Sequence, residues 1–123
     1  MITGFFSYKL REGIDMAAYE AEAFRMYQRV AGNPEFGFVD LKSFKGEAGE
    51  EVLVATFESL EGIEAWRNDP EHVLTQERGR TEWFDSYWGG EIVRHWEYDR
   101  ETGRRDTPER AKRLAALGQA PAT

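Results

Sequence analysis

The sequence contains no cysteine among its 123 residues, which excludes disulfide bonds, zinc–thiolate sites and cysteine nucleophiles. Long apolar runs are also missing, because no stretch approaches the roughly 20 residues that a helix needs to cross a bilayer. The N-terminal segment lacks the basic-then-apolar layout of a signal peptide. From these absences we expect a cytoplasmic protein that does not enter the membrane.

Positive charge is scarce, with 16 Lys and Arg against 23 Asp and Glu and a formal net charge of −7. The acidic excess lies in residues 1–98, whereas residues 99–123 are weakly basic. An acidic surface repels both the phosphate backbone of nucleic acids and anionic lipid headgroups. We therefore expect neither nucleic acid nor a membrane surface as a partner.

Several catalytic motifs are absent as well. The sequence has no glycine-rich phosphate loop, no nucleophile elbow and no group of His, Asp and Glu at metal-ligand spacing. We therefore expect no protein-bound metal. Hydrophobic residues make up 41% of the chain and aromatic residues 14%, which is enough to build the core of one domain of this length.

Hydrophobic periodicity predicts elements in the order βαββαβ. Strands are expected at residues 2–10, 36–45 and 51–58, and a fourth within residues 85–98, clearest at 91–98. Helices are expected at residues 15–31, 60–68 and 69–84. The last two form one helix broken at Asp69-Pro70, and Gly89-Gly90 is expected to form a bulge or turn before the last strand. The predicted fold class is α+β: a ferredoxin-like βαββαβ protomer with an antiparallel four-stranded sheet.

Both faces of the expected strands carry large apolar residues. On the third strand, Val52 and Val54 alternate with Leu53, Ala55 and Phe57. Two helices cover only one face of a four-stranded sheet, so a monomer would expose an apolar face larger than soluble monomers usually tolerate. A second copy packed sheet to sheet would bury this face, and the sequence therefore predicts a homodimer.

The C-terminal segment is expected to lie outside the domain formed by residues 1–98. Residues 99–106 are predicted to form a polar linker. Thr107-Pro108 then begins a short helix that extends to about Leu117. Two interpretations of this extension remain open, packing on a partner copy and mobility.

The segment from residue 66 to residue 88 holds three of the four tryptophans and one of the two histidines. If Asp69 is the N-cap, His72 lies at the third helical position, where the helix dipole disfavours the charged imidazolium. A neutral imidazole accepts a proton, so His72 is the candidate catalytic base. The alternative is that one ring nitrogen caps local backbone while the ring packs against the sheet.

Aromatic and polar residues near His72 are candidates for a pocket. His72, Gln76, Gly79 and Trp83 lie on one stripe of the predicted helix, and the glycine leaves space for a ligand or for close approach to the sheet. Core packing is the alternative explanation of this stripe. The residues that we expect to bind substrate are Trp66, Gln76, Trp83, Tyr87 and Tyr27.

Short motifs follow one another along the chain: Ala65-Trp66, the helix start Pro70-Glu71-His72, Gly79-Arg80, and Trp83-Phe84 leading to Tyr87. In this order they resemble the antibiotic biosynthesis monooxygenase superfamily of dimeric α/β barrels, over about residues 1–98. The resemblance implies ferredoxin-like protomers whose sheets join into a dimeric barrel, with a pocket between sheet and helices. Some members oxidise quinols or phenols with dioxygen and no metal or flavin, others bind and degrade haem, and many have no assigned activity.

The haem-degrading branch of the superfamily implies a histidine ligand on the second helix, a tryptophan before it and an asparagine on the first strand. Trp66 matches the tryptophan. The ligand position falls near Gln76, the asparagine position falls near Ser7, and His72 lies about one turn too early. We therefore expect no cofactor, with haem bound through a shifted His72 as the alternative.

The expected function is that of a cofactor-independent monooxygenase acting with dioxygen on a small phenol or quinol. In this function His72 would remove the hydroxyl proton and the aromatic residues would form the pocket walls. Two alternatives stay open, a haem-binding or haem-degrading monooxygenase and a non-catalytic dimer that binds a small ligand.

Overall fold

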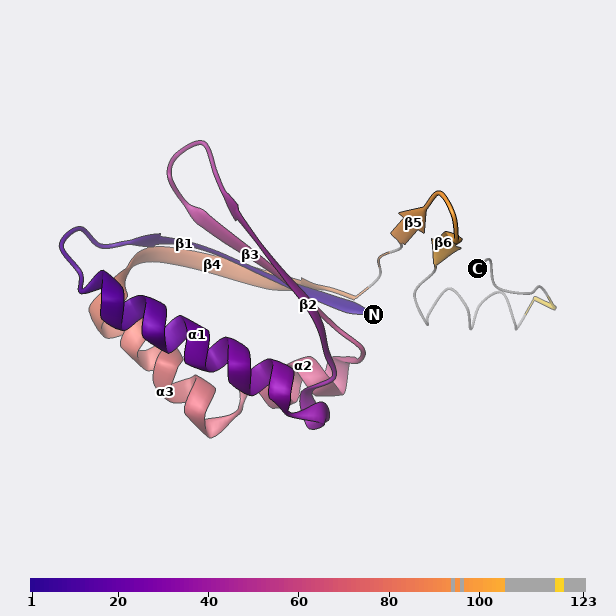
Figure 1. Cartoon of the computed structure of the whole chain (residues 1–123), viewed down its shortest axis with the longest axis horizontal. Coiled ribbons are helices and arrows are strands. Elements are labelled where there is room, and N and C mark those ends of the chain that lie inside the picture. The colour runs from indigo at the N-terminus through magenta and orange to yellow at the C-terminus, as the bar shows by residue number, and fades with distance from the viewer. Residues whose placement is uncertain (94, 96, 106–116, 119–123) are drawn as a thin grey trace.

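The structure is a computed structural model that describes residues 1–93, 95, 97–105 and 117–118. An antiparallel sheet with the strand order β2-β3-β1-β4 is covered on one face by helices (Figure 1). This arrangement confirms the predicted α+β, ferredoxin-like fold. The elements are β1 (Ile2–Leu10), α1 (Met16–Gly32), a 3-10 turn (Pro34–Phe36), β2 (Phe38–Lys45), β3 (Glu51–Phe57), α2 (Leu60–Arg67), α3 (Pro70–Arg78), a π-helical turn (Gly79–Trp83), β4 (Phe84–Ile92), β5 (Glu97–Asp99) and β6 (Gly103–Arg105).

Each of the three helices begins at a side-chain cap. Asp15, Ser59 and Asp69 each accept a hydrogen bond from the backbone N–H three residues further on, at 3.1, 3.0 and 3.0 Å. Such a bond satisfies one of the N–H groups that the first helical turn leaves free. The cap predicted at Asp69 is confirmed, and so is the break between α2 and α3.

The core lies between the sheet and the helices. The central strand β1 pairs with both β3 and β4, and its even-numbered residues face the helices. Gly4 lets α2 approach closely, because a Cβ at this position would lie 2.9 Å from Cδ1 of Ile63. The buried cluster consists of Ile2, Val30, Phe36, Phe57 and Ile63.

The prediction for the fourth strand is wrong in two respects. First, β4 ends at Ile92, which pairs with Thr3, only one residue from the beginning of β1 at Ile2. Second, Gly89-Gly90 lies inside β4 instead of before the strand. A Cβ at Gly89 would lie 2.6 Å from the carbonyl oxygen of Phe5, so the close approach of the two strands requires glycine here.

The chain beyond β4 also differs from the prediction. Strands β5 and β6 form a small antiparallel hairpin where the end of a strand and a polar linker were expected. In Figure 1 this hairpin lies beyond the end of β4, apart from the main sheet. The helix predicted at 107–117 falls almost entirely outside the described residues.

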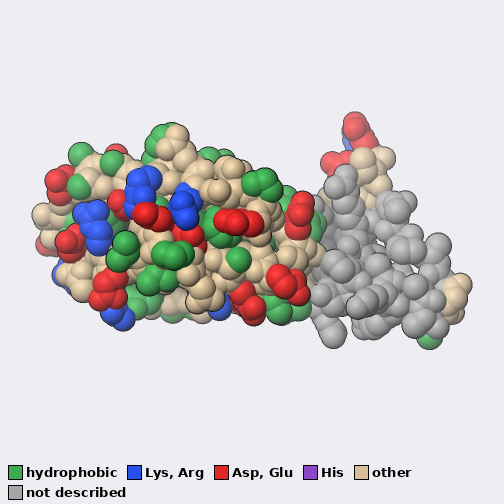
Figure 2. All heavy atoms as spheres, turned by 90° about the horizontal axis from the view of Figure 1, so that it is seen from below, with side chains coloured by type: hydrophobic (Ala, Val, Ile, Leu, Met, Phe, Trp, Pro, Cys, Tyr) green, Lys and Arg blue, Asp and Glu red, His purple; other side chains and the backbone are tan. Residues whose placement is uncertain are grey.

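The two faces of the molecule differ in chemistry. Charged side chains are spread over the helical face in Figure 2, and the ion pair between Arg25 and Glu71 connects α1 to α3 there. The opposite face of the sheet, here called the outer face, exposes Phe44, Trp88 and Ile92 by 54%, 64% and 45%. The helices leave this apolar face uncovered, as the sequence predicts. No helix in the described part of the chain is long and apolar enough to span a membrane.

Candidate functional site

His72 lies at the junction of α2 and α3, where its ring stacks on Trp66. The two ring centroids are 4.0 Å apart, the planes differ by 13°, and Nδ1 lies 2.9 Å from the carbonyl oxygen of Trp66. Because a carbonyl oxygen only accepts, Nδ1 carries the hydrogen in the neutral ring and Nε2 keeps a lone pair. Burial lowers the pKa of His72, opposed by the Trp66 carbonyl and by Asp69. The imidazole is therefore neutral at neutral pH.

Asp69 holds the start of α3 and, with it, His72. The carboxylate is buried, accepts the backbone N–H of His72, and accepts two hydrogen bonds from the Arg29 guanidinium at 2.8 and 2.7 Å. The hydrogen bonds from Arg29, more than the one from the His72 backbone, lower the pKa of Asp69 to about 2. This bidentate pair connects α1 to α3 and positions the histidine.

Gln76 lies beside His72 and closes the end of α2. Its Nε2 is 3.1 Å from the carbonyl oxygen of Arg67 and 3.1 Å from Nδ1 of His72. Because Nδ1 already donates to Trp66, the amide donates to the Arg67 carbonyl. Position 76, near which the haem-degrading branch would place its histidine ligand, holds an amide, which is no iron ligand. Within the described residues, no three carboxylate or imidazole side chains gather where a metal ion could be held.

Trp83 and Tyr87 belong to a second group, which lies between the sheet and α1 and which we call the aromatic cluster. Tyr19 is central to it, because its ring lies 5.3 Å from Trp83 and its hydroxyl donates to the hydroxyl of Tyr8 at 2.6 Å. Burial, with the nearby Glu51 carboxylate, raises the pKa of both tyrosine hydroxyls, so both stay protonated. Trp83 is only 4% exposed and is part of the packing. The aromatic cluster consists of Phe6, Tyr8, Tyr19, Trp83, Phe84 and Tyr87.

The structure divides the predicted site residues among three places. Trp66, His72 and Gln76 meet at the junction of α2 and α3, as the sequence predicts. Trp83 and Tyr87 lie in the aromatic cluster. Tyr27 projects from α1 elsewhere and packs edge-on against Phe38 of β2, with ring centroids 5.8 Å apart. The roles of these residues in binding or catalysis stay predictions.

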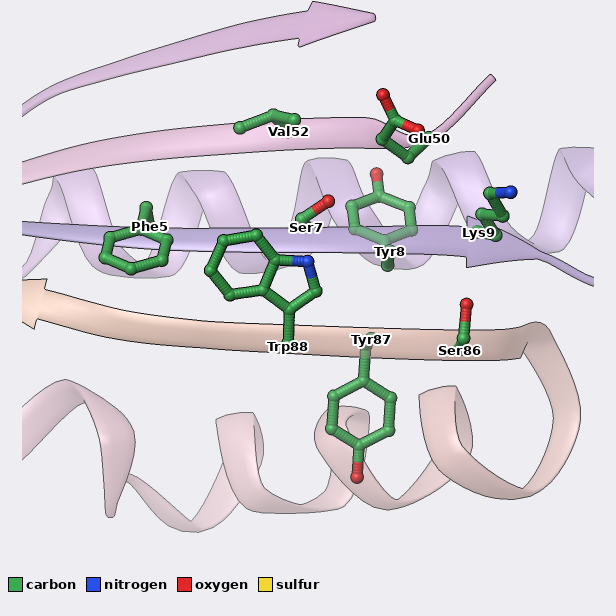
Figure 3. Close-up of a pocket in the computed structure, with 9 residues that line it drawn as sticks. All are labelled: Phe5, Ser7, Tyr8, Lys9, Glu50, Val52, Ser86, Tyr87 and Trp88. Carbon is green, nitrogen blue, oxygen red and sulfur yellow. The ribbon is translucent and has the colours of Figure 1, made fainter. Parts of the chain in front are cut away.

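A cavity of about 300 Å³ lies on the outer face of the sheet (Figure 3). We call it the outer groove. Of the residues predicted from the sequence it includes Tyr87 alone, and the Tyr87 ring points away from the groove toward the helices. The lining residues are Phe5, Ser7, Tyr8, Lys9, Glu50, Val52, Ser86, Tyr87 and Trp88.

Strand register assembles the outer groove from three separate segments. Ser7 pairs with Val52 on one side and with Trp88 on the other, so these side chains share the outer face. The Trp88 ring meets Phe5 edge-on at 5.3 Å. The sequence analysis missed this site. The alternation along β1 indicates that Phe5, Ser7 and Lys9 share one face, but only the strand pairing shows what lies beside them.

Comparison with known proteins finds one curated relative and several solved structures with the same fold. No family model matches the sequence. The uncharacterised protein YqjZ of Bacillus subtilis (strain 168) is 33% identical over 69 residues, which are 56% of this chain and 59% of YqjZ. The chain thus spans about three fifths of the length of the curated relative that it matches.

Solved structures match over most of the chain. A Nitrosomonas europaea protein described as a candidate antibiotic biosynthesis monooxygenase has a TM-score of 0.60 and 8% identity, over 75% of this chain and 96% of that one. SnoaB of Streptomyces nogalater, described as a cofactor-independent oxygenase, has a TM-score of 0.59 and 16% identity. The match covers 74% of this chain and 89% of SnoaB. The chain shares its fold with both of these proteins. A protein from Bacteroides fragilis, described as dimeric, of unknown function and with a ferredoxin-like fold, has a TM-score of 0.51 and 14% identity. The match covers 74% of this chain and 93% of that protein. At these identities the likeness establishes a shared fold, which confirms the resemblance seen in the sequence at that level.

Proposed function

We propose that the protein is a monooxygenase that oxidises a small phenol or quinol with dioxygen and needs no metal or organic cofactor. The observation that carries the proposal is the neutral imidazole of His72, whose Nδ1 is held by the Trp66 carbonyl while Nε2 keeps a lone pair. The fold shared with SnoaB, which is described as a cofactor-independent oxygenase, supports the same reaction class.

In this reaction the substrate itself is the reductant. Nε2 of His72 takes the hydroxyl proton, and the resulting phenolate is electron-rich enough to react with dioxygen. One oxygen atom enters the ring and the other leaves as water together with two hydrogens of the substrate. The substrate supplies all four electrons that dioxygen takes up and leaves as a quinone. The stacked Trp66 ring and the Asp69 cap hold the imidazole in place through the proton transfer.

Oxygen uptake by the purified protein with a panel of hydroquinones and naphthols tests the proposal. The rate of oxygen uptake by the His72→Ala variant should be lower by about 100-fold or more, the usual scale for loss of a general base. His95→Ala is the matched control, because this second histidine lies near Thr3 on the outer face. A His72→Ala variant with near-full activity would remove His72 from the mechanism, and a wild type that consumes no oxygen would end the oxygenase proposal.

The pH dependence of the same assay follows from the lowered pKa of His72. Only the neutral imidazole accepts a proton, so the rate should be constant through neutral pH. It should fall only in acid, below the ordinary histidine value of about 6.5. A rate that already falls between pH 8 and pH 7 would contradict His72 as the base.

We also propose that the protein is a homodimer joined through its outer sheet face. The large exposed side chains there, including Phe44 and Ile92, would be buried by a second copy, and the Bacteroides fragilis protein of the same fold is described as dimeric. Ile92→Asp should halve the mass measured by light scattering. Leu74→Asp, at an exposed position of α3, should leave the mass unchanged. A wild-type monomer at micromolar concentration would contradict the proposal.

A second candidate function is that of a non-catalytic dimer that binds a small ligand. The outer groove favours it, because this cavity lies on the other side of the sheet from His72. Ligand binding without oxygen uptake would support this candidate. The haem alternative is tested by titration with haem, for which we expect no shifted Soret band, because Gln76 stands near the position where the histidine ligand is expected.

A further inference from the structure

The outer groove is amphipathic along its length. In Figure 3 the rings of Phe5 and Trp88 and the side chain of Val52 lie toward one end, and Lys9 and Glu50 lie toward the other. Ser7 lies between the two ends. A ligand that fills this groove therefore has a flat apolar part and, next to it, a polar part.

The polar groups of the outer groove have no partners within the protein. Ser7 is 5% exposed as a residue, and its hydroxyl, which is not sealed from solvent, forms no hydrogen bond to any described residue. Lys9 and Glu50 line the same cavity with opposite charges and form no ion pair with each other or with another residue in the described part of the chain. Lys9 thus brings a cation and Ser7 a hydroxyl to the groove, and Glu50 brings a carboxylate that lies against Gly46 at one end of it.

We infer that the outer groove binds a small zwitterionic aromatic molecule of the aromatic amino acid class. Its carboxylate pairs with Lys9 and accepts the hydroxyl of Ser7, and its ammonium group pairs with Glu50. The ring packs against Phe5 and Trp88, where contacts between aromatic groups are favourable. A volume of about 300 Å³ is at the small end of ligand pockets and suits one such molecule.

Charge complementarity selects this ligand over simpler ones. A plain aromatic acid would pair with Lys9 but would place its negative charge beside Glu50. A plain aromatic amine would pair with Glu50 but would place its positive charge beside Lys9. The inference names the ligand class for the second candidate function and is independent of the oxygenase reaction at His72. A second copy packed on the outer face would form the roof of the groove.

Calorimetric titration of the full-length protein tests the inference with four probes. L-Phenylalanine carries the ring and both charges, 3-phenylpropanoate lacks the amine, phenethylamine lacks the acid, and L-leucine lacks the ring. We expect L-phenylalanine to bind at least about tenfold more tightly than each of the others, the scale of one charged hydrogen bond.

Variants then assign each charge. Lys9→Met should weaken L-phenylalanine binding about tenfold or more and should not weaken phenethylamine, which is relieved of a like charge. Glu50→Gln should weaken L-phenylalanine binding and, for the same reason, should not weaken 3-phenylpropanoate. The matched control is Lys42→Met, because Lys42 is an exposed lysine of β2 that pairs opposite Val54 on the same face. All three positions lie at the surface or at its edge, and circular dichroism confirms that each variant folds.

Three results would overturn the inference. They are no binding of L-phenylalanine, equal binding of all four probes, and affinity that is unchanged in both Lys9→Met and Glu50→Gln. If L-phenylalanine fails to bind and Trp88→Ala weakens the dimer, a side chain of the second copy fills the groove instead. His72→Ala should retain L-phenylalanine binding. Calorimetry therefore tests this inference, and oxygen uptake tests the oxygenase proposal independently of it.

Discussion

Replacement of Asp69 by alanine tests how the structure positions His72. Asp69 is 6% exposed and has two tasks, since it caps α3 through the backbone N–H of His72 and receives two hydrogen bonds from Arg29 on α1. Loss of the cap costs about 1 kcal/mol. Loss of hydrogen bonds to a charged group adds about 1.5 kcal/mol. The variant should therefore lose about 2–3 kcal/mol of unfolding free energy.

This loss corresponds to a melting temperature lower by about 8–12 °C, for an unfolding entropy of about 2.1 cal/mol/K per residue. Asp69→Asn separates the two tasks, because asparagine is a good N-cap but carries no charge. We expect Asp69→Asn to lose about half as much as Asp69→Ala. Urea unfolding of both variants and the wild type gives the three free energies.

The pH dependence provides an internal check. The folded pKa of Asp69, about 2, lies below the unfolded value of about 3.9. The group therefore contributes its full stability above about pH 4 and loses it as the pH falls toward 2. The difference between wild type and Asp69→Asn should shrink over this interval. An Asp69→Ala variant within 0.5 kcal/mol of the wild type, about the scatter of surface substitutions, would refute the reasoning.

Two further predictions concern packing and the tyrosine pair. Gly62→Ala should lower the unfolding free energy by about 1–3 kcal/mol in urea denaturation, because its Cβ would lie 2.2 Å from the carbonyl oxygen of Phe36. Gly32→Ala, with nothing within 4 Å of its Cβ, should be neutral or raise the free energy by up to about 1 kcal/mol, and equal effects would contradict this account. In an alkaline titration followed by ultraviolet absorbance, Tyr8 and Tyr19 should ionise above the ordinary tyrosine value of about 10, and Tyr19→Phe should remove one late ionisation. Because their folded pKa values are raised, both hydroxyls stabilise the fold below about pH 10 and lose that contribution as the pH rises, and a single ionisation of all tyrosines near pH 10 would contradict the burial of the pair.

Local patterns in the sequence were sufficient to predict most elements. Caps act within one helical turn, so Asp15, Ser59 and Asp69 could be identified without any tertiary information. The end of β4 could not be identified from local sequence, because it depends on how β4 pairs with the beginning of β1. The same holds for Gly89-Gly90, whose glycines serve the close approach of Phe5 across the sheet and not a turn.

The candidate site was predictable to the extent that its residues are neighbours in the chain. Trp66, His72 and Gln76 lie within a few turns of one another, and the structure brings them together. Tyr27 and Trp83 shared an aromatic character with them but pack elsewhere, because amphipathic spacing indicates a buried face without naming what it faces. The cytoplasmic location expected from the sequence stays a prediction.

By itself, the sequence determined the order of the elements, the acidic charge and a sheet that is apolar on both faces, since these depend on residue types and on spacings of two to four residues. Only the tertiary structure decided which nitrogen of His72 carries the hydrogen, because that depends on the carbonyl placed beside it. It also decided that Ser7 lies between Val52 and Trp88, since strand register is set by pairing between segments far apart in the chain. The outer groove exists through that pairing alone.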